Sequence, residues 1–365
     1  MSTTSHSRLS RLAETMNGAG IDAFLAWHPV TMGYLHNFHE GAHERFMALC
    51  IHRDGRAAII CPSLSVTQAQ RAGITDVRSW RDGENALELF LNLADEWGLR
   101  SAIIAVDEEL PAHMLLPIQT ALPAALFRTS GDVLSGLMRI KSPEEIKLLR
   151  KAGHIADEAF DAILPMIKEG MTERDLEYAL RDAMTRLGGT PTFSIVAAGP
   201  NGAEPHHLSD DTKLKRGDVV ILDFGCNYEG YLSDITRTVA IGEASDEAKS
   251  AYELVYAAHM AARKAIKPGV SCGAIDDAAR SVIENGGFGE FFMHRTGHGI
   301  GLRGHEEPYI LSGNPMPLVP GHCFSIEPGV YFPGKFGVRI ENIVTLDESG
   351  EDSLNANPSP TLLVV

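Results

Sequence analysis

Cysteine and positive charge are both scarce in this sequence. The five cysteines are scattered, odd in number and never spaced as CxxC, a pattern typical of a reducing compartment such as the cytoplasm. Lysine and arginine number 32 against 48 aspartates and glutamates. The resulting net charge of -16 argues against nucleic acid as a partner.

Long apolar runs are also missing. No stretch approaches the roughly 18 apolar residues that a membrane-spanning helix needs. Residues 1–16 lack the apolar core of a signal peptide, so we expect a cytoplasmic protein without a membrane partner. Hydrophobic residues make up 44% of the chain and charged residues 22%, which is ordinary for a globular protein. At 365 residues the chain is long enough for two domains.

Four carboxylates and one histidine in the C-terminal part carry the most information. Each lies among apolar neighbours that predict a strand or a turn; they are Asp223, Asp234, His298, Glu327 and Glu341. Four ionised carboxylates cannot share a dry interior without positive charge, and two divalent cations would balance them. Oxygen ligands with one imidazole suit Mn, Co, Fe or Zn. Two such ions about 3.5–4 Å apart form a site that splits acyl or phosphoryl bonds with a bridging hydroxide.

The N-terminal part alternates short apolar strands with amphipathic helices. We expect strands at residues 23–27, 47–52, 57–61 and 102–106, and helices at 7–17, 64–72 and 86–97. This pattern predicts a small α/β domain without a chemical motif over residues 1–137. The second domain, residues 138–365, follows at LMRIKSPEE, where Ser142, Pro143 and Glu145 predict a helix start with a capping box.

The second domain contains a weak internal repeat. IKEGMT at residues 167–172 matches IKPGVS at 266–271, and a helix that ends in two glycines follows each copy. In both halves a carboxylate stands six residues after a glycine, Asp223 after Gly217 and Glu327 after Gly321. The match could arise by chance, but the agreement of motif, helix and carboxylate favours duplication. Two α+β halves would then face each other across a pseudo-two-fold axis with metals between them.

The segments LDFGCNYEGYLSDITRTVAIG, HRTGHGIGLRGHEEP and SIEPGVYFPGKFGVRIEN resemble the metallopeptidase family with the "pita-bread" fold. That family includes methionine aminopeptidase, Xaa-Pro aminopeptidase, prolidase and creatinase. The resemblance covers residues 138–365, and the N-terminal domain is similar in layout to that of creatinase and the Xaa-Pro enzymes. It implies an α+β fold with a pita-bread catalytic domain preceded by a smaller creatinase-like α/β domain.

The resemblance also implies a ligand set for two divalent ions, manganese first, with cobalt, zinc or iron as other fits. Asp234 and Glu341 would bridge both ions, and Asp223 would chelate one of them. His298 and Glu327 would bind the other, and Glu327 would also shuttle the proton of the bridging hydroxide. All five positions of the set are intact in this sequence.

Further residues match the catalytic positions of that family. His206 fits the substrate-side histidine, with His207 ranked below it, and His305 fits the histidine that polarises the scissile carbonyl. Arg339 would either contact the substrate or form a salt bridge that positions Glu341. Three other histidines match nothing in the family and are predicted to be structural: His154, His259 and His294.

These features predict a dinuclear metallo-exopeptidase that cleaves the Xaa-Pro bond of small peptides, as an aminopeptidase or a dipeptidase. The alternative is a hydrolase or lyase of a small solute such as ectoine or dimethylsulfoniopropionate, since relatives use the same scaffold. A metal-free binding module is disfavoured because the ligands are intact. The resemblance also implies a homodimer, in which residues 27–46 would cross to the partner.

Overall fold

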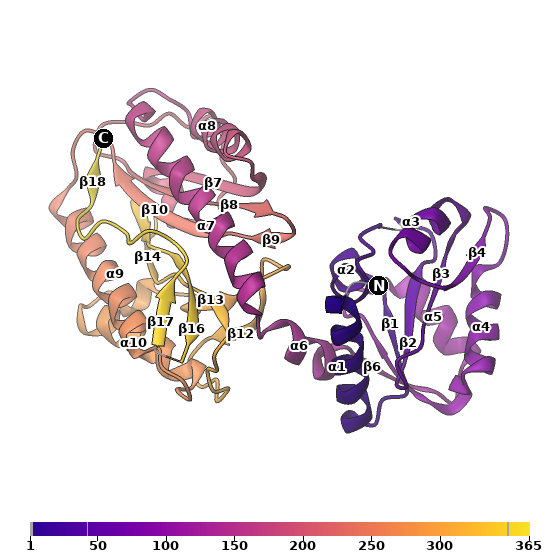
Figure 1. The fold of residues 1–365 in the computed structure, drawn as a ribbon. Coiled ribbons are helices and arrows are strands. Elements are labelled where there is room, and N and C mark those ends of the chain that lie inside the picture. Colours follow the sequence, from indigo (N-terminus) through magenta and orange to yellow (C-terminus); the bar gives the residue numbers. More distant parts are fainter. Residues whose placement is uncertain (1–2, 42, 349) are drawn as a thin grey trace. The chain divides into compact units, whose positions relative to one another are not determined.

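The computed structural model describes residues 3–41, 43–348 and 350–365, which cluster into two compact units, Met1–Met138 and Arg139–Val365 (Figure 1). Each unit has its own sheets and hydrophobic core. Within the described ranges, no helix combines the length and the apolarity that a bilayer crossing requires.

The N-terminal unit is built on one six-stranded mixed sheet with the order β4-β3-β2-β1-β5-β6. Its strands are β1 (Ala23–Ala26), β2 (Ala48–His52), β3 (Ala57–Pro62), β4 (Asp76–Trp80), β5 (Ile103–Val106) and β6 (Leu126–Thr129). Its helices are α1 (Thr3–Ala19), α2 (Pro29–His36), α3 (Val66–Arg71), α4 (Ala86–Glu96), α5 (Ala112–Ala121) and α6 (Gly136–Met138). Alternate strand residues pack against Phe90 and Leu93 of α4 and Ile118 of α5, so these two helices cover one face of the sheet.

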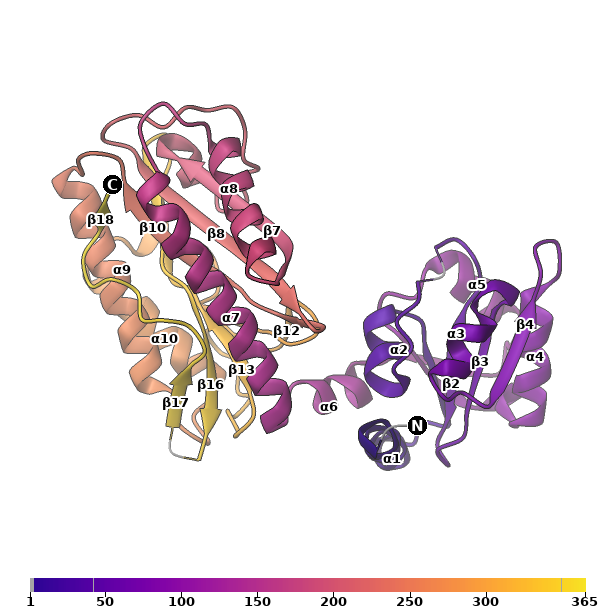
Figure 2. The same cartoon turned by 45° about the horizontal axis from the view of Figure 1, so that its top comes forward.

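The C-terminal unit consists of two halves, each with a pair of helices and a five-stranded sheet. The first half contains α7 (Pro143–Ile163), α8 (Glu173–Arg186), β7 (Thr190–Ala198), β8 (Val219–Tyr228), β9 (Tyr231–Leu232) and β10 (Ile235–Ala240), which the C-terminal strand β18 (Leu363–Val364) extends. The second half contains α9 (Asp246–Ala265), α10 (Cys272–Asn285), β11 (Gly297–Gly299), β12 (Glu306–Ile310), β13 (Cys323–Ile326), β16 (Asn342–Asp347) and β17 (Gly350–Ser353), beside a hairpin of β14 (Gly329–Phe332) and β15 (Phe336–Arg339). Figure 2 shows both helix pairs on the outside with the strands between them.

The start of α7 shows how the sequence sets these elements. Ser142 accepts a hydrogen bond from the Glu145 amide, and the Glu145 side chain accepts one from the Ser142 amide. Pro143 is the first helical residue, so the predicted capping box is confirmed. The apolar face of α7 then packs with α8 on β7, β8 and β10 through residues such as Ile155, Leu176 and Leu222.

The two halves repeat each other in hydrogen bonding as well as in sequence. The Gly170 and Leu214 amides donate to the carbonyls of Leu214 and Met171. In the second half, the Gly269 and Leu318 amides donate to those of Leu318 and Val270. The glycines before β8 and β13 both take a positive φ, 93° at Gly217 and 91° at Gly321. Their amides donate to carbonyls at similar places, that of Ile241 just after β10 and that of Leu346 near the end of β16. This agreement identifies two copies of one α+β unit.

The halves meet where β10 approaches β16. The Glu341 amide donates to the Thr236 carbonyl at 3.1 Å, and the Thr238 hydroxyl donates to the Arg339 carbonyl at 2.7 Å. This contact places the carboxylate-bearing ends of both sheets side by side.

Candidate metal centre

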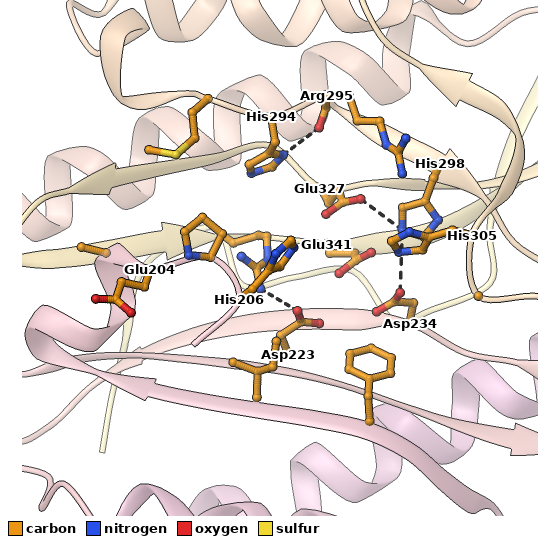
Figure 3. Close-up of a pocket in the computed structure, with 17 residues that line it drawn as sticks. Glu204, His206, Asp223, Asp234, His294, Arg295, His298, His305, Glu327 and Glu341 are labelled. Atoms are coloured by element: carbon orange, nitrogen blue, oxygen red, sulfur yellow. Dashed lines mark hydrogen bonds and ion pairs between the residues drawn. The ribbon is translucent and has the colours of Figure 1, made fainter. Parts of the chain in front are cut away.

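All eight residues singled out in the sequence line one cavity of about 1080 Å³ between the two halves of the C-terminal unit. They are Asp223, Asp234, His298, Glu327 and Glu341, together with His206, His305 and Arg339. Asp223 lies in β8 and His298 in β11, while Asp234, Glu327 and Glu341 each stand next to the end of a strand. Figure 3 shows the four carboxylates around a common space, with His298 at one side of it.

The ligand atoms of these residues form overlapping groups in which all atoms lie within 4.8 Å of one another. One group is Asp223, Asp234 and Glu341, and a second is His298, Glu327 and Glu341. A third joins Asp234 and His298 to His305. Asp234 and Glu341 therefore each belong to a group on the Asp223 side and to one on the His298 side.

The electrostatics of the cavity favour a bound cation. Burial, followed by repulsion from neighbouring carboxylates, raises the pKa of Asp234 and of Glu341 well above its usual range. Burial raises the pKa of Glu327 to about 7, against the opposing effect of Arg339. Burial, helped by nearby His305, lowers the pKa of His298 to about 3, so its imidazole is neutral, as a metal ligand must be.

Two carboxylate oxygens of the cavity have lone pairs available for a cation. Among the described residues, buried Asp223 Oδ1 and Glu341 Oε1 have no hydrogen-bond partner. A buried carboxylate oxygen without a donor is costly unless a cation meets it. The oxygen-rich set with one imidazole fits a hard or borderline divalent ion, so these residues fit the metals that the sequence predicts.

Three other ligand oxygens are held by neighbouring side chains. Asp223 Oδ2 accepts from Arg339 Nη2 at 2.6 Å, and Glu341 Oε2 accepts from the Thr236 hydroxyl at 2.8 Å. The Ser325 hydroxyl donates to Glu327 Oε1 at 3.0 Å. Such contacts fix the direction of these three carboxylates before a metal binds.

His298 is oriented by its own strand. Its Nδ1 lies 3.1 Å from the Gly299 carbonyl oxygen, which fixes a proton on Nδ1 when the ring is neutral. Nε2 then faces the carboxylates, 3.2 Å from Glu327 Oε1 and 3.8 Å from Asp234 Oδ2 (Figure 3). The His305 ring lies beside it, with the two ring centroids 3.8 Å apart.

The contacts of Arg339 differ from one of the two roles predicted for it, the salt bridge that positions Glu341. Its buried guanidinium forms a salt bridge with Asp223, not with Glu341, because β15 lies against β8 and β10. Its Nε donates to the Thr236 hydroxyl at 3.1 Å, and that hydroxyl donates to Glu341, so Glu341 is reached only indirectly. Arg339 Nη1 also donates to the Tyr331 hydroxyl at 2.8 Å.

These histidines fall in four different places. His206 and His305 line the cavity, whereas His207 Nε2 lies 2.8 Å from the buried Glu173 carboxylate. His259 is buried with Nδ1 3.1 Å from the Ile326 carbonyl oxygen, and burial lowers its pKa to about 3, as suits a structural residue. His154 is exposed on α7.

His294, which the sequence predicts to be structural, belongs to the cavity wall. His294 lines the cavity, and its Nε2 lies 2.8 Å from the Tyr331 hydroxyl that also accepts from Arg339. Arg295, which no sequence pattern singled out, also lines the cavity, with its guanidinium over the Tyr309 ring. Their position just before His298, in the segment that leads into β11, was the signal that could have found them.

The chain matches two protein-family models, and it matches relatives over nearly its full length. The model of metallopeptidase family M24 matches residues 147–348, and the creatinase/prolidase N-terminal domain matches residues 8–137. The probable dipeptidase PepE of Mycobacterium tuberculosis is 38% identical over 98% of this chain and 96% of that protein. The Xaa-Pro dipeptidase of Lactobacillus helveticus is 37% identical over 93% of this chain and 94% of its own length. A crystal structure of prolidase from Thermococcus sibiricus superposes with a TM-score of 0.95 at 34% identity, and the match covers 100% of both chains.

A repeated α+β fold around a cluster of carboxylates and an imidazole defines a metal-dependent hydrolase. The chain belongs to metallopeptidase family M24, and the pita-bread fold class predicted from the sequence is confirmed. The family implies divalent metal ions, and the acidic and histidine groups of the cavity are able to hold them.

The shared positions of Asp234 and Glu341 lead to a prediction on metal content. Asp234→Ala or Glu341→Ala should remove more bound metal than Asp223→Ala, because each of the first two belongs to groups on both sides of the cavity. Elemental analysis of the purified variants measures the difference, with Asp182→Ala, an exposed surface carboxylate, as the control. Equal metal retention in all three site variants would contradict shared ligation.

Metal binding should also depend on pH. Protons compete with the metal for the carboxylates, and in the metal-free protein Glu327 takes up its proton as pH falls through about 7. The increase in Tm on adding manganese should therefore be larger at about pH 8 than at about pH 6. The Tm of the metal-free protein is subtracted from that of the manganese-loaded protein at each pH. Buried histidines away from the metal titrate in both forms, so their opposing effect on Tm cancels. Thermal unfolding measures it, and an increment that is larger at the lower pH would refute the prediction.

Proposed function

We propose that this protein is an exopeptidase that hydrolyses the bond between an N-terminal residue and proline, with two divalent ions held by Asp223, Asp234, His298, Glu327 and Glu341. The observation that carries the proposal is the convergence of these five side chains, with two unpartnered carboxylate oxygens, in one cavity. The name of the Lactobacillus relative, Xaa-Pro dipeptidase, supports the choice of substrate. Manganese is the first candidate for the ion, and a small peptide is the partner.

The chemistry divides between the ions and the side chains. When bound, the ions would lower the pKa of a water molecule toward neutrality and polarise the scissile carbonyl. Glu327 would hold a proton and pass it to the leaving proline nitrogen, which has no hydrogen of its own in the peptide bond.

Histidines and Arg339 would complete the site. His305, beside His298, would donate a hydrogen bond to the carbonyl oxygen as negative charge develops there, and His206 would hold the substrate. Arg339 would keep the Asp223 carboxylate oriented through their 2.6 Å contact. Apolar side chains on the same cavity wall, Phe193, Ile195 and Pro205, would exclude water around the substrate.

Hydrolysis assays test this function. The manganese-loaded protein should cleave Xaa-Pro dipeptides, Xaa-Pro-Yaa peptides or both, and should leave ectoine intact. The comparison of dipeptide with longer peptide separates a dipeptidase from an aminopeptidase. Cleavage of ectoine without cleavage of either peptide would replace the proposed function with that of a small-solute hydrolase.

We further propose that the domains divide at residues 137 and 138, that the protein is cytoplasmic, and that it forms a homodimer. Residues 27–46 would reach the partner subunit. Sedimentation velocity should give a species of twice the 39.5 kDa chain mass. A 39.5 kDa monomer at the concentration used for assays would exclude the homodimer.

A further inference from the structure

Glu173 is a buried carboxylate that lies outside the cavity and has no part in the chemistry described above. It is the first residue of α8, and its side chain is 0% exposed. Oε1 accepts from the Ala198 amide at 2.8 Å and from Asn201 Nδ2 at 2.9 Å. Oε2 accepts from the Asp210 amide at 3.1 Å and from His207 Nε2 at 2.8 Å.

Three of the four donors belong to the connection between β7 and β8, and the fourth, Ala198, is the last residue of β7. Two of them, Ala198 and Asn201, precede Glu204 and His206, and the other two follow. The stretch between them lines the metal cavity: Figure 3 shows Glu204 and His206 at its edge. Glu173 thus ties both ends of the loop that carries His206 to the first turn of α8.

A metal role for this carboxylate does not fit. Glu173, His207 and Asp210 lie close enough together to hold an ion. However, a carboxylate offers about four lone-pair sites, and each Glu173 oxygen already accepts two N–H groups. No lone pair remains for a cation.

A simple role in starting α8 does not account for Glu173 either. Thr172 and Asp175 already form a complete capping box at this helix end. The Glu173 side chain turns away from the helix toward the loop, although burying a carboxylate is costly unless donors surround it. What the four hydrogen bonds fix is the path of residues 198–210, not the helix.

We propose that Glu173 is a positioning residue for the peptidase reaction, which holds His206 at the cavity by clamping both ends of its loop. The inference rests on the proposed function, in which His206 contacts the substrate. His207, next in the chain, is one arm of this clamp: its bond to Glu173 turns it away from the cavity that His206 lines.

A double-mutant cycle tests the proposal. In Glu173→Gln, whichever way the amide turns, two of the four donors face an NH₂ group instead of an oxygen. We expect kcat/KM for an Xaa-Pro dipeptide to fall roughly 10- to 100-fold with metal content unchanged, because a small displacement of a substrate-binding group has effects of that size. In a His206→Ala background the same substitution should lower kcat/KM by no more than about twofold. Equal losses in both backgrounds would show a general structural role and overturn the proposal.

Hydrogen–deuterium exchange gives a readout that does not need peptidase activity. Residues 199–211 should exchange faster in Glu173→Gln than in the wild type, while the β8 and β13 strands stay protected. Unchanged exchange in the loop overturns the clamp even if the wild type cleaves peptides. An inactive wild type would count against the proposed function alone, and the exchange result would still decide the clamp.

Two further variants complete the design. Asp175→Asn removes a carboxylate from the same helical turn without touching the loop, so it should lower the Tm but leave kcat/KM unchanged. If Glu173→Gln does not fold, His207→Ala removes one of the four donors at a partly exposed position. It should give a smaller loss that again disappears in the His206→Ala background, and a loss that persists there would refute the clamp.

Discussion

Removal of divalent ions is expected to abolish hydrolysis of Xaa-Pro substrates, and added manganese or cobalt is expected to restore it. Without a cation, burial and mutual repulsion raise the pKa of Asp234, Glu327 and Glu341, so the cavity holds protons instead of ionised ligands. In that state the site has neither the charge to activate water nor the charge to polarise a carbonyl. The loss should therefore be complete and not partial.

The experiment is dialysis against a chelator, followed by elemental analysis, activity measurement and titration with each metal. Circular dichroism before and after chelation separates loss of the ion from loss of the fold. Full activity in a preparation whose metal content is zero would refute the role of the five ligands.

His305→Ala is expected to lower kcat by roughly a hundredfold or more, because it removes a hydrogen-bond donor from the oxygen that becomes negative in the transition state. His305 belongs to the group formed with Asp234 and His298, yet it is exposed and the other ligand groups are complete without it. Metal content should therefore remain at the wild-type level. Stopped assays at saturating substrate, with elemental analysis on the same sample, measure both quantities.

His154→Ala is the matched control, since His154 is an exposed histidine on α7, outside the cavity. It should leave kcat and metal content unchanged. If His305→Ala kept full turnover, or if it lost turnover only in proportion to lost metal, the donor role would be wrong.

The fold was predictable where burial imposes a pattern. The strands expected at residues 23–27, 47–52, 57–61 and 102–106 are β1, β2, β3 and β5, which lie inside the sheet and are almost fully buried. The strands that the sequence did not indicate, β4 and β6, are the two edges of that sheet. Most of their residues are partly or fully exposed, so no apolar alternation marks them.

For the site, the sequence identified side chains but not their contacts. The carboxylate that stands six residues after a glycine in both halves, Asp223 and Glu327, favoured convergence, because an isolated charge would not recur at the same place in both copies of a repeat. The partner of Arg339 could not be read in this way, since it depends on how β15 lies against β8 and β10. The place of His294 at the cavity could not be read for the same reason, because its contact with Tyr331 joins segments 37 residues apart. The catalytic roles themselves stay predictions.

The most direct test of the central claim, that these five side chains hold two ions, is anomalous X-ray diffraction from crystals of the manganese-loaded protein. The account predicts two manganese peaks in the cavity, one beside Asp223 and one beside His298 and Glu327, with Asp234 and Glu341 contacting both. A cavity without peaks, or manganese bound only at Glu173, His207 and Asp210, would contradict it.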